Sequence, residues 1–458
     1  MKKLLRGGTV VSANGLLRAD VLIEGEKIAR VAPDLPVGDA RVVDSSGRLL
    51  FPGFIDAHTH FDLDVCDTTT ADDFASGTRS AVCGGTTAVV DFACPEKGQT
   101  LGFGLRLWHE KADGRCSCDY GFHMTIDDWN ETIRSELPEM FRQGVSSFKM
   151  YMTYPAMKLD EETQLAAMKE IAKLGGLTGM HCEVSGMIDE KTAELKRAGR
   201  LSPASHPLSR PASAEAAAVR RFCALAGQAN ALAMVVHLSA KESLDAVRAA
   251  RAQGVRVFAE TCPQYLLLDD SVYSKQDYAG AAGFVCAPPI RKREDADALW
   301  RALEAGEIQT VSTDHCSFTR QQKEAGRADF TKIPGGLPGV ETRGILLYSG
   351  GVAAGRIRPE TMCRVLSENP AKLYGMYPQK GVIAPGSDAD IVVLNPDASG
   401  VVTAASLHSR AGYTPFEGMR VQGQIEQVYL RGTLAAENGE PAAPLSGRFL
   451  SRGKPQLL

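Results

Sequence analysis

Apolar runs and amphipathic stretches alternate through most of the chain. Eight apolar runs are typical of buried strands, at residues 54–57, 86–92, 118–126, 147–152, 177–181, 231–238, 255–260 and 308–313. Between most of them the apolar residues recur at helical spacing, over residues 161–174, 214–226, 241–253 and 294–304. This alternation predicts an α/β fold, and eight strands is the number of a closed parallel barrel. A doubly wound open sheet alternates in the same way, but no glycine-rich phosphate-binding motif follows the first strand, which disfavours a dinucleotide-binding fold.

The two ends of the chain have a different pattern, made of short strands and turns. Strand-like segments occur at residues 4–12, 20–24, 27–32 and 41–43, and again at residues 390–394 and 427–430. Together they predict one small β domain built from both termini. We therefore expect the N-terminal part of this domain in residues 1–50, the barrel in residues 51–378, and the C-terminal part with a tail in residues 379–458.

Composition narrows the class of partner. The chain is 44% hydrophobic and 23% charged, with a formal net charge of −4, so neither nucleic acid nor an anionic membrane is an expected partner. Lys2 and Lys3 are not followed by the apolar region of a signal peptide, and no window reaches the length of a membrane span. Eleven cysteines without C-x-x-C pairs suit a reducing compartment. These features predict a cytoplasmic protein.

Polar residues follow several predicted strands where each strand ends. His58 and His60 are two residues apart, so in a strand they point to the same face. The later strand ends supply Lys149, His181, His237 and Asp314. Each histidine alone is more often a hydrogen-bonded core residue. In a parallel barrel, however, all these ends share one mouth, and the set together predicts a transition-metal site.

Lys149 lies in the apolar segment S-S-F-K-M-Y-M, where a charged and unpaired ammonium group would be costly to bury. One interpretation pairs it with a neighbouring carboxylate. The other is a neutral amine that has taken up carbon dioxide, because the resulting carbamate could bridge two cations. For His315, next to Asp314, contact with a substrate and a packing role both remain open.

The chain contains a series of motifs in a fixed order, G-F-I-D-A-H-T-H-F, S-S-F-K-M-Y-M-T-Y, E-T-C-P-Q-Y-L, A-P-P-I-R, S-T-D-H-C, G-L-P-G-V-E and P-G-S-D-A-D-I-V. Together they resemble the cyclic amidohydrolases, specifically the dihydropyrimidinase and hydantoinase branch. The resemblance implies a (β/α)8 TIM barrel with a small β-sandwich domain built from both chain termini. It also implies a homotetramer, since relatives commonly form one and residues 439–458 resemble a tail that reaches a neighbouring subunit.

The same resemblance implies a site with two divalent metal ions, usually zinc. One ion would be held by His58, His60 and Asp314, and the other by His181 and His237. Lys149, modified to N6-carboxylysine, would bridge them. A metal-bridging hydroxide would attack the ring amide carbonyl, and Asp314 would carry the proton to the departing nitrogen. Tyr154 occupies the position of the tyrosine that stabilises the oxyanion.

The substrate loops depart from the pattern of the family. Ala287 and Gly335 stand where relatives have a serine and an asparagine that hold the imide largely through backbone groups, so we expect binding to persist. The ring substituent should meet the loops after the first and fourth strands. The candidates are Leu63, Val65 and Cys66 on one loop and Tyr151, Met157 and Leu159 on the other. Tyr151 and Met157 predict room for a bulky substituent.

The resemblance thus implies an enzyme, a hydrolase of carbon–nitrogen bonds in cyclic amides. The expected small-molecule substrates are 5,6-dihydropyrimidines or 5-substituted hydantoins. Allantoinases and dihydroorotases share the metal ligands and remain alternatives. A non-catalytic assembly protein is a further alternative, but such relatives have lost metal ligands, whereas this chain keeps all six positions.

Overall fold

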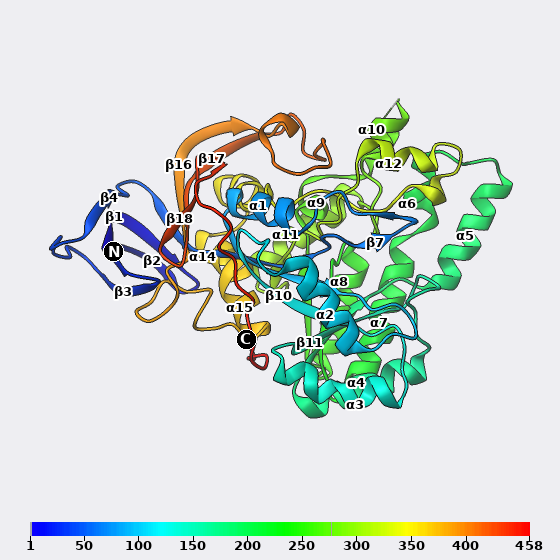
Figure 1. Cartoon of the computed structure of the whole chain (residues 1–458). Coiled ribbons are helices and arrows are strands. Elements are labelled where there is room, and N and C mark those ends of the chain that lie inside the picture. Colours follow the sequence, from blue (N-terminus) through cyan, green and yellow to red (C-terminus); the bar gives the residue numbers. More distant parts are fainter. Residues whose placement is uncertain (1, 276) are drawn as a thin grey trace.

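Two sheets organise the chain in the computed structural model, which describes residues 2–275 and 277–458 (Figure 1). The larger domain is built on eight parallel strands in chain order: β6 (Phe54–Thr59), β9 (Thr86–Ala93), β10 (Asp119–Thr125), β11 (Ser147–Tyr151), β12 (Leu177–His181), β13 (Leu232–Val235), β14 (Val257–Thr261) and β15 (Thr310–Val311). A parallel bridge between Thr59 and His315 joins the first strand to the chain just beyond the last one. This bridge closes the barrel, so the predicted (β/α)8 fold is confirmed.

The barrel strands are apolar because they are covered on both faces. Every residue of β6, β9, β10, β11 and β12 is buried. The main covering helices are α1 (Phe74–Cys83), α2 (Leu101–Ala112), α3 (Glu131–Arg142), α4 (Glu161–Leu174), α5 (Ser185–Arg197), α7 (Ala212–Ala229), α8 (Lys241–Ala252) and α11 (Arg293–Glu304). Local sequence sets their ends, since Asp160 caps the start of α4 and Gly175, with a φ of +80°, ends it.

Shorter helices fill the loops and the segment that returns to the β domain. They are η1 (Pro203–Ser205), α6 (His206–Ser209), α9 (Pro263–Leu267), η2 (Asp270–Ser274), α10 (Tyr278–Ala282), α12 (Arg320–Lys323), η3 (Glu324–Gly326), η4 (Phe330–Lys332), α13 (Arg343–Leu347), η5 (Tyr348–Ala353), α14 (Pro359–Cys363), η6 (Arg364–Glu368), α15 (Asn369–Leu373) and η7 (Ala404–Ser406). Helices α6, α10 and α12 lie with α5 on one side of the barrel (Figure 1).

The second sheet combines both ends of the chain. It contains β1 (Lys2–Ser12), β2 (Gly15–Glu24), β3 (Lys27–Ala32), β4 (Arg41–Asp44), β5 (Leu49–Pro52), β16 (Ile391–Val401), β17 (Arg420–Leu430), β18 (Thr433–Glu437) and β19 (Glu440–Pro441). Leu50 in β5 pairs with Val10 of β1 on one side and Val393 of β16 on the other. The sheet packs around a hydrophobic core of its own, which confirms the β domain built from both termini. The domain boundaries given above stay a prediction. A further antiparallel pair, β7 (Asp64–Val65) and β8 (Thr68–Thr69), lies in the loop after β6.

A buried ionic cluster connects the β domain to the barrel. The Nζ atom of Lys380 lies 2.6 Å from Asp119 Oδ2, 2.7 Å from Asp390 Oδ2 and 2.9 Å from Asp388 Oδ2. Asp119 is the first residue of β10 and also pairs with Arg431. Burial opposes the charge of Lys380, but the three carboxylates outweigh it and raise its pKa above the ordinary value.

The C-terminal tail binds the barrel of its own chain. The Tyr120 N–H donates to the Arg448 carbonyl at 3.0 Å, and the Leu450 N–H donates to the Tyr120 carbonyl at 2.7 Å. The buried side chain of Arg452 donates to Ser147 Oγ at 2.9 Å. These contacts lie at the starts of β10 and β11. Contact of the tail with a neighbouring subunit remains a prediction.

Candidate active site

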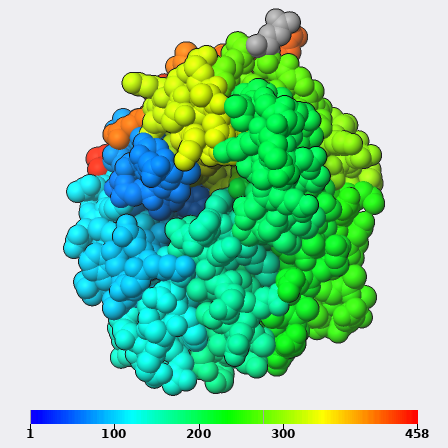
Figure 2. Space-filling model, turned by 90° about the vertical axis from the view of Figure 1, so that its right-hand side faces the viewer, coloured from blue at the N-terminus to red at the C-terminus, as the bar shows by residue number. Residues whose placement is uncertain are grey.

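All six predicted ligand residues lie where the barrel strands end. His58 is in β6 with His60 just after it, Lys149 is in β11, His181 ends β12, and His237 and Asp314 lie in the turns after β13 and β15. Asp314 is partly accessible and the other five are buried. Figure 2 looks onto this end of the barrel and shows a hollow. Around it lie the blue loop after β6, the blue-green segment after β11, the green residues of α5 and α6, and a yellow segment after β15.

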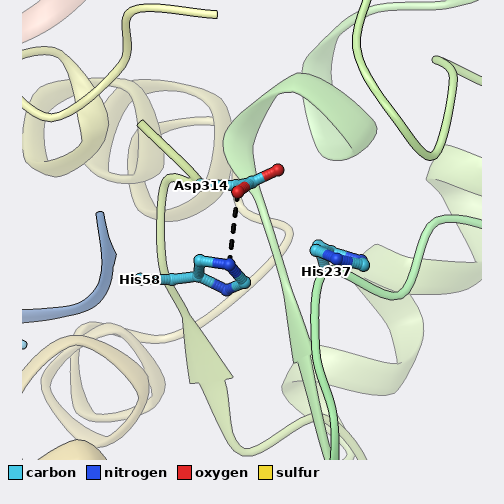
Figure 3. A group of neighbouring side chains, drawn as sticks. All are labelled: His58, His237 and Asp314. Carbon is cyan, nitrogen blue, oxygen red and sulfur yellow. Dashed lines mark ion pairs between the residues drawn. The ribbon is translucent and has the colours of Figure 1, made fainter. Parts of the chain in front are cut away.

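The donor atoms of these residues converge in two adjoining groups. In the first, His58 Nε2 and His60 Nε2 each lie 3.2 Å from Asp314 Oδ1. In the second, His181 Nδ1 and His237 Nε2 face each other at 3.0 Å. Ligand atoms of His58, His237 and Asp314 all lie within 4.8 Å of one another, and Figure 3 shows the imidazole of His237 opposite the close contact between the other two.

Lys149 lies between these groups without a carboxylate partner. Its Nζ is 3.4 Å from His58 Nε2 and sits over the rings of Phe92 and Tyr151, at 4.6 and 5.1 Å from their centroids. Within the described residues it forms no ion pair, in contrast to Lys380. Burial lowers the pKa of Lys149 from its ordinary value. The structure therefore does not support the first interpretation of Lys149, an ion pair with a neighbouring carboxylate.

Two buried glutamates orient the imidazoles. His58 Nδ1 lies 2.6 Å from Glu260 Oε1, and His181 Nε2 lies 2.8 Å from Glu183 Oε2. If each of these nitrogens donates its proton to the carboxylate, the other nitrogen of the ring keeps a lone pair directed at the cluster. Burial would raise the pKa of Glu183, but Arg210 and His181 outweigh it and bring it to about 2.

The protonation of the cluster favours cation binding. Burial and the nearby Lys149 hold the pKa of His58 well below its ordinary value, and burial and His181 do the same for His237. These imidazoles are therefore neutral near pH 7, as ligands must be. No described residue bonds to the buried Nδ1 of His60. Four imidazoles, a carboxylate and an amine fit a divalent transition-metal site.

Backbone geometry at the site is unusual. Tyr154, His237 and Asp314 have φ angles of +68°, +38° and +52°, although none is glycine. Such conformations cost energy and persist where the surrounding structure enforces them, which is common at functional sites. His237 lies two residues after the end of β13 and Asp314 three residues after the end of β15, so the left-handed positions belong to the turns that follow these strands.

Tyr154 lies next to the second group of ligands. Its ring centroid is 5.1 Å from that of His181, and the guanidinium carbon of Arg210 is 5.5 Å from its ring. Burial raises the pKa of Tyr154, so its hydroxyl keeps the proton and can donate a hydrogen bond. Tyr151 was expected on the loop after the fourth strand, but it is the last residue of β11 itself. Its ring centroid lies 6.0 Å from that of His181.

The other predicted substrate residues lie on loops around the mouth. Leu63 and Met157 are half-buried in the loops after β6 and β11. Ala287 is half-buried, and a β-carbon added at Gly335 would meet nothing within 4 Å, so this loop has space where relatives have a side chain. The Gly336 N–H donates to the Val285 carbonyl at 3.0 Å, which joins the loops that carry Ala287 and Gly335.

His315 has a packing role. It is fully buried, its Nε2 lies 3.1 Å from Asp72 Oδ2, and its Nδ1 accepts from the Gly339 and Val340 N–H groups at 3.1 and 3.2 Å. Both ring nitrogens are therefore occupied by the protein, which leaves neither for a substrate.

Sequence reasoning missed Glu260, Glu183 and Arg210. Glu260 opens the E-T-C-P-Q-Y-L motif and Glu183 lies two residues after His181, so both could have been found as polar residues at strand ends. Arg210, between α6 and α7, had no comparable signal, because only the folded chain brings it to Glu183.

Comparison with known proteins agrees with this site. The profile of the Amidohydrolase family matches residues 49–435. The D-hydantoinase of Geobacillus stearothermophilus is 39% identical over 458 residues, covering 99% of this chain and 97% of the relative. The D-phenylhydantoinase of Escherichia coli (strain SE11) is 41% identical over 460 residues, covering 99% and 98%. The crystal structure of dihydropyrimidinase from Brevibacillus agri NCHU1002 has a TM-score of 0.98 and 40% identity, over the whole of both chains.

The chain therefore belongs to the amidohydrolase family, and within it to the branch of hydantoinases and dihydropyrimidinases. Both the resemblance stated from the motifs and the expectation of a hydrolase are confirmed. Among the described residues, no helix is long and apolar enough to cross a membrane.

Proposed function

We propose that this enzyme opens the ring of cyclic amides by hydrolysis, with 5-substituted hydantoins, of the D series, and 5,6-dihydropyrimidines as substrates. The observation that carries the proposal is the convergence of the six proposed metal ligands in a chain that matches D-hydantoinases over almost its whole length. The names of those relatives support the substrate class.

The proposed cofactor is a pair of zinc ions. His58, His60 and Asp314 would hold one, and His181 and His237 the other, since these are the two groups of donors that face one another. Two such ions would lower the pKa of a bound water and polarise the amide carbonyl. Glu260 and Glu183 would keep the imidazoles in the ligating orientation.

Lys149 is proposed to be carboxylated. Its amine adds to carbon dioxide, which forms a nitrogen–carbon bond and releases a proton. The buried position without an ion-pair partner supports this step, because the modification gives the side chain a negative charge between two proposed cations.

Asp314 is the proposed acid and base. It accepts a proton from the attacking water and donates it to the ring nitrogen as the carbon–nitrogen bond breaks. Burial would raise its pKa, but the neighbouring histidines outweigh it and bring it to about 2, so the carboxylate starts in the accepting form. Tyr154 donates a hydrogen bond to the oxygen that becomes negative.

The ring itself is proposed to bind through backbone groups of Ala287 and Gly335. Leu63, Tyr151 and Met157 would line the place of its substituent. Open space at Gly335 supports a loop that binds without a side chain.

The test is hydrolysis of four rings by metal-loaded protein: dihydrouracil, a D-phenylhydantoin, allantoin and dihydroorotate. Opening of the first two is the expected result, and Asp314→Asn, as a control for contaminating enzymes, should lose it. Activity confined to allantoin or dihydroorotate would overturn the substrate assignment. Metal content should be two zinc ions per chain, and isotope-labelled bicarbonate should give a carbamate signal by NMR that Lys149→Ala lacks.

We further propose a homotetramer in the cytoplasm. The resemblance to the family implies a tetramer, and all eleven cysteines are free, as a reducing compartment allows. Sedimentation of the purified protein tests the subunit number.

A further inference from the structure

Lys323 is a buried lysine near the mouth of the barrel that the proposed chemistry does not use. It is the last residue of α12 and is only 2% exposed. Its Nζ donates to the Val285 carbonyl at 3.1 Å and to the Pro334 carbonyl at 2.9 Å. Within the described residues it forms no ion pair, so two neutral backbone oxygens are its hydrogen-bond acceptors.

The two acceptors belong to the two loops proposed to bind the ring. Val285 precedes Ala287 by two residues, and Pro334 directly precedes Gly335. The Val285 carbonyl also accepts from the Gly336 N–H at 3.0 Å. Lys323 and this backbone bond together fix the distance between the loops.

Space filling alone does not explain a lysine at this position. Burying an ammonium group without a carboxylate is unfavourable, and burial lowers the pKa of Lys323 to about 8. A methionine would fill the same volume without that cost. What only a group with several N–H donors provides is a directed bond to both loops at once.

Helix α12 is itself held in place. Thr319 and Gln322 form a capping box at its start, and Gln322 Nε2 also donates to Thr68 Oγ1 at 2.9 Å and to the Thr69 carbonyl at 2.7 Å. These threonines form β8, in the loop after β6 that carries Leu63. The hydroxyl of Tyr278 donates to the Lys323 carbonyl at 2.6 Å. The helix thus connects the loop after β6 with the two loops that carry Ala287 and Gly335.

We propose that Lys323 is a positioning residue that sets the relative placement of the loops at Ala287 and Gly335, and through them the fit of the ring. This inference rests on the proposed function in assigning ring binding to those two loops. Small displacements of binding groups strongly affect catalysis, so a side chain that touches no substrate can still control it.

The test uses the metal-loaded enzyme, Lys323→Met, and Lys323→Gln, which keeps one amide donor. The control is Lys332→Met, which changes an exposed lysine two residues before Pro334. Hydrogen–deuterium exchange should rise in Lys323→Met within residues 283–290 and 333–340, with unchanged zinc content. On the D-phenylhydantoin, KM should rise about 10-fold or more while kcat stays within about 3-fold, with a smaller rise in KM for Lys323→Gln.

Unchanged exchange in both segments would overturn the proposal, whether or not the wild type opens any of the four rings. Faster exchange with an unchanged KM would also overturn it, because the loops would then move without affecting the ring. If neither Lys323 variant folds, the lysine supports the barrel as a whole and the proposal is wrong. Faster exchange in a protein whose wild type opens no ring would support the loop placement and refute the proposed function.

Discussion

Lys149 and Lys380 are buried to nearly the same degree and have opposite surroundings. Lys380 is bound by three carboxylates between the two domains, which raise its pKa. Lys149 faces imidazoles and aromatic rings, and burial lowers its pKa. The first lysine is fixed as a cation by its partners, whereas the second is left available as a base. Burial alone therefore says nothing about reactivity; the charges within a few ångströms decide it.

The largest expected effect is on the unpaired lysine. Lys149→Ala should lower kcat/KM by about 10³-fold or more and release metal, because the proposed bridging ligand is lost. A short carboxylic acid such as propionate should restore part of the activity by occupying the gap. Lys158→Ala, an exposed lysine in the following loop, is the control and should behave as wild type. Two bound metals and full activity without the added acid would refute the carboxylation.

Removal of the paired lysine should damage stability instead of chemistry. Lys380→Met leaves Asp119, Asp388 and Asp390 without their shared cation, at an expected cost of about 3–5 kcal/mol in the free energy of unfolding. Activity per folded, metal-loaded chain should stay near that of wild type. The control, Lys372→Met, breaks a more accessible pair with Glu368 and should cost less than about 1 kcal/mol in urea unfolding. If Lys380→Met lost as much kcat as Lys149→Ala, the assignment of Lys380 to stability and of Lys149 to chemistry would be wrong.

A smaller loss of metal affinity is expected for the carboxylate that orients a proposed ligand without binding the metal itself. Glu260→Ala removes the acceptor for His58 Nδ1 and should weaken metal binding about 10–100-fold, measured by competition with a chelator. Glu260→Gln is the matched control, since its amide oxygen can still accept that proton. Equal affinity of the alanine variant and wild type would show that His58 keeps its orientation without Glu260.

The smallest effect concerns a buried base outside the ligand set. His206 donates from Nε2 to the Cys286 carbonyl at 2.7 Å, and burial together with Arg210 lowers its pKa to about 3. Between about pH 6.5 and 3 the unfolded chain binds a proton there that the folded chain does not. The contribution of His206 to the free energy of unfolding should thus be fully present above this pH window. As the pH falls through the window, that free energy should decrease by about 1.4 kcal/mol per pH unit.

His206→Gln keeps an N–H donor and removes the titration. Urea unfolding at about pH 7.5 and about pH 5.5 should show wild type losing about 1 kcal/mol more than the variant. Comparing the two losses cancels the titration of all other groups, so parallel curves would show that His206 is protonated in the folded chain too.

Much of the fold was predictable because periodicity reflects burial. Helix α4 and strand β3 have the predicted bounds. The last barrel strand was predicted at residues 308–313 but spans only Thr310–Val311, and the sixth was predicted at residues 231–238 but spans Leu232–Val235. Both errors lie next to a proposed metal ligand in a left-handed backbone conformation, His237 and Asp314, where an apolar run continues although the strand has ended.

The site was predictable as far as its residues lie at strand ends. The H-x-H pair and the later histidines converge because a parallel barrel gathers these ends. The bonds that depend on loops could not be predicted from spacing. Arg210 reaches Glu183, and Lys323 reaches Val285 and Pro334, only through the paths of segments with no periodic pattern. For the same reason, packing and substrate contact could not be separated for His315 from the sequence.

The tail that crosses the base of the barrel has a consequence for how the protein is made. Arg452 donates to Ser147 Oγ and to the Phe122 carbonyl, and the Gly453 N–H donates to the Gly375 carbonyl at 2.9 Å. Strand β5 likewise has no partner on one side until β16 is synthesised. When the ribosome has synthesised the whole barrel, β16 and the tail residues that cover the base of the barrel are therefore still missing. The nascent chain can form these contacts only after residues 448–453 have emerged, and loss of those residues would expose the starts of β10 and β11.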